Sequence, residues 1–249
     1  MVKKGTETTV ELHDLAVKIV KLYSPKRLVV YGGAIKSGDN GAFYYASQNV
    51  IKDYKNDLPV KSVFIDNGAN TLISALDFQP QNSVQSLDLF CHGDPNGVYF
   101  VIGSSLDKNV ENKDLKPIAS NIYKSRLDAN FRGLWDGEKK IKNQYGISNL
   151  KLSSFTNESK IEIHGCNTGS GDDCFASELS KQLFDAGKTR SVVIGHASKA
   201  NPNIGGTTSV IKQDYRHGTR IIYHNGLAVK TVTSSGRIAS GVINTALGK

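Results

Sequence analysis

Five short apolar segments that each end at a turn constrain the fold of this 249-residue chain more than any other feature. They span residues 27–31, 60–65, 87–92, 160–166 and 191–196, and helix-patterned stretches at about 42–54, 70–76 and 172–187 lie between them. Strands that alternate with helices predict a mainly parallel sheet with helices on both faces. The fold class that we expect is therefore α/β, a three-layer sandwich built on a sheet of about six strands.

The remaining segments fit around this sheet as one domain over residues 1–249. Thr8 and Glu11 form a capping box that predicts an N-terminal helix over residues 8–23. Residues 103–157 are polar and basic and read as an insertion, with a helix expected around 118–127. Asn225-Gly226 separates two apolar runs and predicts a hairpin, so residues 220–249 are expected to form a C-terminal hairpin and tail.

Composition excludes several classes of protein. The chain has 31 Lys and Arg against 23 Asp and Glu, a net charge of +8, yet the basic residues are scattered and no aromatic residues interleave with them. Nucleic-acid binding is therefore not favoured. No apolar run is long enough to cross a membrane, which predicts no membrane partner. An odd number of cysteines, three, leaves at least one free thiol and fits a reducing compartment.

Chemically reactive residues stand at the ends of three of the predicted strands. These are Cys91-His92, His164-Gly165-Cys166 and His196. Parallel sheets bind ligands beyond the carboxyl ends of their strands, so these side chains are expected at one edge. A catalytic cysteine needs a nearby base and a backbone amide for the oxyanion. Either residue alone would read as an ordinary core residue, but together His92 and Cys166 predict a catalytic pair.

The two blocks at residues 87–93 and 161–166 resemble those of caspase-like cysteine peptidases. In this clan, which includes metacaspases, legumain and bacterial toxin self-processing domains, an apolar strand ending in His-Gly precedes another ending in a small residue and Cys. The resemblance covers residues 27–196 and implies a caspase-like fold and cysteine endopeptidase activity. The interval from His92 to Cys166 is longer than caspases usually have, because residues 103–157 lie within it.

The resemblance also implies roles for individual residues. Cys166 would attack the scissile carbonyl, His92 would protonate the leaving amine, and the amides of Gly93 and Cys166 would bind the oxyanion. His164 occupies the position where metacaspases carry an acidic pocket residue. It would line the substrate pocket with the stretch after the fifth strand, which contains His196 and Ser198. Lys36 and Asp66 are weaker candidates for the site. No cofactor or metal is implied.

Three rival interpretations remain. A zinc site could use Cys91, His92, His164, Cys166 and His196, although neighbouring strand residues point to opposite faces and no C-x-x-C spacing is present. The chain could be a non-catalytic binding module with the same fold. The same dyad could also serve deamidation or acyl transfer, because these reactions pass through a thioester.

The expected partner is a protein or peptide substrate, with a regulatory or immunity protein as a second candidate. The N-terminus has basic residues without an apolar stretch behind them, so no Sec-type signal is expected. These features fit a cytoplasmic processing enzyme, or a bacterial effector or toxin domain delivered into a target cell.

Overall fold

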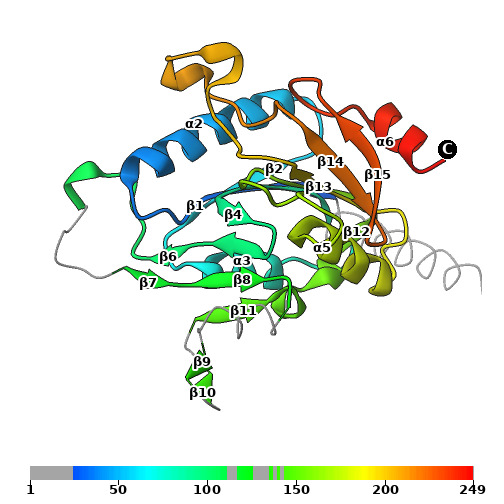
Figure 1. Cartoon of the computed structure of the whole chain (residues 1–249), viewed down its shortest axis with the longest axis horizontal. Helices are drawn as coiled ribbons and strands as arrows, with labels where there is room; N and C mark the ends of the chain where they lie inside the picture. Colours follow the sequence, from blue (N-terminus) through cyan, green and yellow to red (C-terminus); the bar gives the residue numbers. More distant parts are fainter. Residues whose placement is uncertain (1–24, 111–116, 126–134, 137–138, 141–142, 249) are drawn as a thin grey trace, which may run out of the picture.

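A seven-stranded sheet forms the centre of the molecule in the computed structural model, which describes residues 25–110, 117–125, 135–136, 139–140 and 143–248 (Figure 1). The strand order is β15-β14-β13-β12-β3-β1-β2. The five strands β2, β1, β3, β12 and β13 are parallel, and the hairpin of β14 and β15 adds two antiparallel strands at one edge. The prediction of a mainly parallel α/β sheet is therefore confirmed.

The bounds of the sheet strands follow the apolar segments closely. They are β1 (Lys26–Gly32), β2 (Val60–Ile65), β3 (Val84–Phe90), β12 (Phe155–Ile163), β13 (Val192–His196), β14 (Arg220–His224) and β15 (Leu227–Val232). Asn225 and Gly226 both have positive φ angles, 48° and 78°, as a tight Asn-Gly hairpin turn requires. The predicted hairpin is thus confirmed.

Helices cover both faces of the sheet. The helix α2 (Ser37–Asp53) packs Phe43, Ala46 and Val50 against one face, and α3 (Ala69–Asp77) and α5 (Phe175–Asp185) cover the other (Figure 1). The predicted helix at 42–54 was too short, because Ser37 and Asn40 also lie in α2 and are buried despite being polar. Alternate strand residues face the two layers, as expected for extended chain.

The segment from 103 to 157 differs from the expectation. In its described part, β7 (Ile118–Ala119) and β8 (Asn121–Tyr123) stand where a helix around 118–127 was predicted, so that prediction is wrong for residues 118–125. This stretch is polar and its hydrophobic pattern is weak, so the sequence did not distinguish helix from strand there. Pairing with neighbouring strands decided the conformation. The insertion also ends earlier than predicted, since β12 begins at Phe155.

A second, four-stranded sheet uses part of this insertion. Its order is β11-β8-β5-β4, with β4 (His92–Asp94), β5 (Gly97–Tyr99) and β11 (Gln144–Gly146). Smaller pairs join β6 (Val101–Ile102) to β7, and β9 (Trp135–Asp136) to β10 (Lys139–Lys140). The predicted strand 87–92 is thus divided, because β3 ends at Phe90 and His92 begins a separate hairpin.

The tail after β15 contains a short helix, α6 (Ser240–Ala246), that the sequence did not predict. Val242, Ile243 and Leu247 pack against a cluster formed by Val192, Ile194 and Ile222. Among the described helices, none has the length and apolar character to cross a membrane. The helix predicted at residues 8–23 lies outside the described residues.

Candidate functional site

The strand ends that precede His92 and Cys166 are in direct contact. β3 and β12 are parallel neighbours, and beyond their last pair the His164 amide donates to the Leu89 carbonyl at 2.8 Å. A Cβ atom on Gly93 would lie 2.7 Å from the Thr168 methyl and 3.6 Å from the Gly165 Cα. A side chain at residue 93 would collide with the Thr168 methyl, so Gly93 lets the turn after β12 pack closely against β4, with Gly165 in van der Waals contact.

His92 and Cys166 lie on the face of the sheet that α2 covers. His92 contacts the α2 residue Phe43 edge-on, with ring centroids 5.4 Å apart. Cys91 faces the opposite layer instead, where it is buried in the core. Burial, with the nearby Cys166, raises the pKa of the Cys91 thiol. The alternation along the strand therefore separates Cys91 from His92, as the sequence predicted.

The His92 imidazole is held by a carboxylate that the sequence analysis missed. Its Nε2 atom lies 3.1 Å from Asp39 Oδ2, and both side chains are about half exposed, at 49% and 45%. Because an ionised carboxylate can only accept, the ring nitrogen that faces it is the one that carries the hydrogen. The Nδ1 atom then remains as the acceptor of the neutral ring.

The position of Asp39 follows from the start of α2. Asp39 lies in the first helical turn, where an acidic side chain is favoured by the helix dipole. The next residue, Asn40, is fully buried and holds the preceding loop in place. Its side chain accepts from the Ala34 amide at 2.9 Å and donates to Ser104 Oγ at 2.9 Å. Lys36 is exposed just before this helix, and Asp66 accepts a hydrogen bond from the Thr71 hydroxyl at 3.1 Å.

The environment of Cys166 is made by the loop after β13. The Cys166 Sγ atom lies 3.8 Å from the Ala200 carbonyl oxygen, and the Asn167 amide donates to the Ser198 carbonyl at 2.9 Å. Tyr215, from the same loop, is buried against Phe90 and Phe43. Burial raises the pKa of the Tyr215 phenol, and the charges of Asp39 and Cys166 add to this effect.

The three predicted pocket residues have different surroundings. Ser198 is exposed beside Cys166. His164 is completely buried, stacks on Phe90 at 4.1 Å and hydrogen-bonds through Nε2 to Asp88 Oδ1 at 3.3 Å. His196 is buried next to it, and burial together with His164 lowers the pKa of His196 to about 3. Neither imidazole reaches the surface, so the structure brings only Ser198 to the solvent-accessible side of the site.

A buried ionic network lies behind these two histidines. Glu162 accepts from Lys160 at 3.0 Å and from Arg220 at 2.5 Å, and both oxygens are thereby occupied. Burial alone would raise the pKa of Glu162, but Lys160, His164 and Arg220 together hold it well below its usual value. Asp88 is compensated in the same way, because Lys160 and the His164 hydrogen bond lower its pKa against the effect of burial.

This network bears on the metal-binding alternative. Asp88, Glu162 and His164 have ligand atoms within 4.8 Å of one another, and among the described residues this is the group that could share an ion. Each Glu162 oxygen already contacts a cation, and Asp88 accepts from Tyr54 and His164. A metal would have to displace these partners, so the group fits a compensated charge network better than a metal centre.

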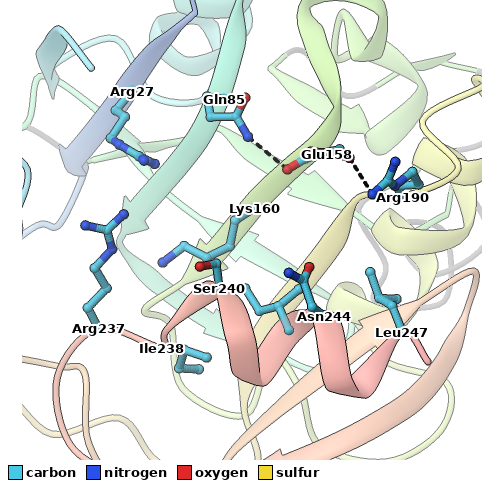
Figure 2. A pocket seen from close by; sticks show the side chains of 11 residues that line it. Arg27, Gln85, Glu158, Lys160, Arg190, Arg237, Ile238, Ser240, Asn244 and Leu247 are labelled. Carbon is cyan, nitrogen blue, oxygen red and sulfur yellow. Dashed lines mark hydrogen bonds and ion pairs between the residues drawn. The ribbon is translucent and has the colours of Figure 1, made fainter. Parts of the chain in front are cut away.

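A cavity of about 210 Å³ lies at the other end of the sheet, where the parallel strands begin (Figure 2). Basic side chains surround it, but each has an acidic partner. Arg27 and Arg237 share Asp57 at 2.7 and 3.0 Å, and Arg190 pairs with Glu158 at 2.6 Å. The positive charges are therefore compensated within the protein, and the cavity is separate from His92 and Cys166.

No protein-family model matches this chain, and no curated protein is significantly similar to it. The candidate site therefore stands on geometry and chemistry alone. Asp39 could have been found from the rule that places sites beyond the carboxyl ends of parallel strands, since it follows β1. Ala200 and Tyr215 carry no such signal, because only the folded loop brings them to Cys166.

Proposed function

We propose that this protein is a cysteine peptidase with Cys166 as the nucleophile and His92 as its acid–base partner. The observation that carries the proposal is the close packing of Gly93 against Gly165, which places the ends of the two reactive strands next to each other. This architecture fits the caspase-like resemblance of the two sequence blocks.

The proposed reaction assigns one task to each group. His92 Nδ1 takes the thiol proton, Cys166 Sγ attacks the scissile carbonyl, and the imidazolium returns the proton to the leaving amine. Asp39 fixes the ring orientation and stabilises the imidazolium. The Gly93 and Cys166 amides are the proposed donors to the oxyanion. Water then hydrolyses the thioester and regenerates the thiol.

The proposed substrate is a protein or peptide, and Ser198 is the exposed member of the predicted pocket residues. His164 and His196 are buried in the described structure, so the proposal assigns them no direct contact with the substrate. All three cysteines are free, which supports action in a reducing compartment. A cytoplasmic processing role and delivery as an effector both meet this condition.

The test measures whether the reactivity of Cys166 depends on His92. Iodoacetamide labelling at neutral pH, mapped by mass spectrometry, should be at least about tenfold slower at Cys166 in His92→Ala than in the wild type. Cys91 and Cys174 are buried and serve as internal references. His224→Ala, which removes a histidine bonded to the Ser191 carbonyl, is the matched control and should leave the rate unchanged. Equal labelling of wild type and His92→Ala would rule the dyad out.

Asp39→Asn is expected to lower kcat/KM by about tenfold to a hundredfold, because the amide can present the wrong group to His92 Nε2 and stabilises an imidazolium less well. The pair is half exposed, so the melting temperature should change little. Asp77→Asn, an exposed carboxylate at the end of α3, provides the control. An unchanged pH–rate profile in Asp39→Asn would show that Asp39 has no part in the reaction.

A further inference from the structure

The loop between β13 and β14, residues 197–219, passes over the candidate nucleophile and is called the strap here. Its first part contributes the Ser198 and Ala200 carbonyls that contact Asn167 and Cys166. Its last part contributes Tyr215, which is buried beside the same site. Cys166 is consequently half-buried, although a nucleophile must be open to its substrate.

The Ala200 carbonyl oxygen faces the sulfur of the candidate nucleophile. A carbonyl oxygen can accept a hydrogen bond from a neutral thiol, but it has no hydrogen to donate to a thiolate. The thiolate is the form that attacks a carbonyl. With the strap in this position, the Ala200 carbonyl also occupies space next to the sulfur that a substrate would need.

The strap is a compact unit closed at its base. His217 Nε2 lies 2.6 Å from the Asn201 carbonyl, and the Asp214 amide donates to the Pro202 carbonyl at 2.8 Å. Gly205, Gly206 and Gly218 have φ angles of 60°, 74° and 72°, which other residues adopt only with strain. The two hydrogen bonds tie the two ends of the strap to each other.

Polar side-chain contacts, together with the packing of Tyr215 on Phe43, hold the strap on α2. Asn49 donates to the Gln213 carbonyl at 2.8 Å and to the Ile211 carbonyl at 3.3 Å. Arg216, which is bonded to Asp214 within the strap, reaches Asp53 at 2.5 Å. Figure 1 shows the orange part of the strap lying above the helix α2. Asn49 and Asp53 lie one turn apart on α2 and form a small latch.

We propose that the strap is an inhibitory element, in which the Asn49–Asp53 latch holds the Ala200 carbonyl against Cys166 until the strap is displaced. The inhibition concerns the same site as the proposed peptidase activity and rests on that function. Release of the latch exposes the sulfur without replacing His92, Asp39 or either glycine.

The test compares the alkylation of Cys166 in the full chain with and without the latch. The double variant Asn49→Ala/Asp53→Asn should label at least about fivefold faster than the wild type, because local opening becomes less costly. Asp185→Asn breaks the exposed Lys181–Asp185 pair on α5 and should leave the rate unchanged. Hydrogen exchange of the strap amides should rise in the double variant only, which separates release of the strap from general unfolding.

Equal alkylation rates in a folded double variant with faster strap exchange would overturn the inhibitory role. Adding His92→Ala to the double variant distinguishes this failure from failure of the dyad. If the strap is inhibitory but the peptidase assignment is wrong, labelling accelerates on release and does not depend on His92. If the dyad is right and the strap is inert, labelling depends on His92 in both backgrounds and release changes nothing.

Discussion

Replacing Cys166 by alanine is expected to lower peptide-bond hydrolysis by about a thousandfold or more, because covalent catalysis is lost altogether. His92→Ala should cost nearly as much, and the double variant should be no worse than either single one, since the two groups act as a unit. The measurement is the formation of new amino termini in a peptide library, followed by mass spectrometry, with the strap in both its latched and released forms.

Cys174→Ser is the matched control for this experiment. Cys174 is buried at the start of α5, where its sulfur accepts from the Ser177 amide, and a serine hydroxyl can replace that acceptor. Its activity should stay close to that of the wild type. Hydrolysis that survives in Cys166→Ala would contradict the proposed mechanism. Thioester formation without new amino termini would instead point to deamidation or acyl transfer.

Glu162→Gln is expected to destabilise the fold by about 3–5 kcal/mol, since it leaves two buried cations with a neutral partner. Glu162 bonds both Lys160 and Arg220, and its side chain is only 1% exposed. The free energy of unfolding, from urea titration at neutral pH, is the quantity to compare. Asp185→Asn removes a carboxylate from an exposed pair and should cost less than about 0.5 kcal/mol.

The pH dependence of this difference has a definite sign. The pKa of Glu162 is lower in the folded protein than in the unfolded chain, where a glutamate has a pKa of about 4.3. Its stabilising contribution is therefore present in full above that value and is lost as the pH falls through the folded pKa. The stability gap between wild type and Glu162→Gln should shrink in acid. A small difference in the free energy of unfolding between wild type and Glu162→Gln at neutral pH would show that the network does not stabilise the fold.

The sheet could be predicted well because its strands are apolar and separated by strong turn residues. Segment 60–65 matches β2 at both ends, and the Asn225-Gly226 turn marked the hairpin. Polar elements were harder to predict. The start of α2 carries buried Ser37 and Asn40, and β7 and β8 have only two and three residues, so their conformation depends on partners distant in the sequence.

The candidate site likewise contains residues that could be predicted from the sequence and residues that could not. His92 and Cys166 could be singled out because each follows an apolar strand beside a glycine. The burial of His164 and His196 could not, since nothing local reveals that Asp88, Glu162 and Arg220 occupy the same layer. The positions of Asp39 and of the strap depend on how α2 and the loop after β13 pack over the sheet. Only long-range packing fixes those positions.

The second sheet changes how the chain between His92 and Cys166 should be regarded. β5 pairs with β4, which begins at His92, and β5 pairs in turn with β8 from the middle of the insertion. β8 then pairs with β11, close to the start of β12. Three described strands between the two residues, β5, β8 and β11, thus extend the sheet that begins at the histidine-bearing strand β4. The part of the chain between the histidine and the cysteine therefore contributes strands that support His92, while β12, which precedes Cys166, pairs directly with β3 in the central sheet.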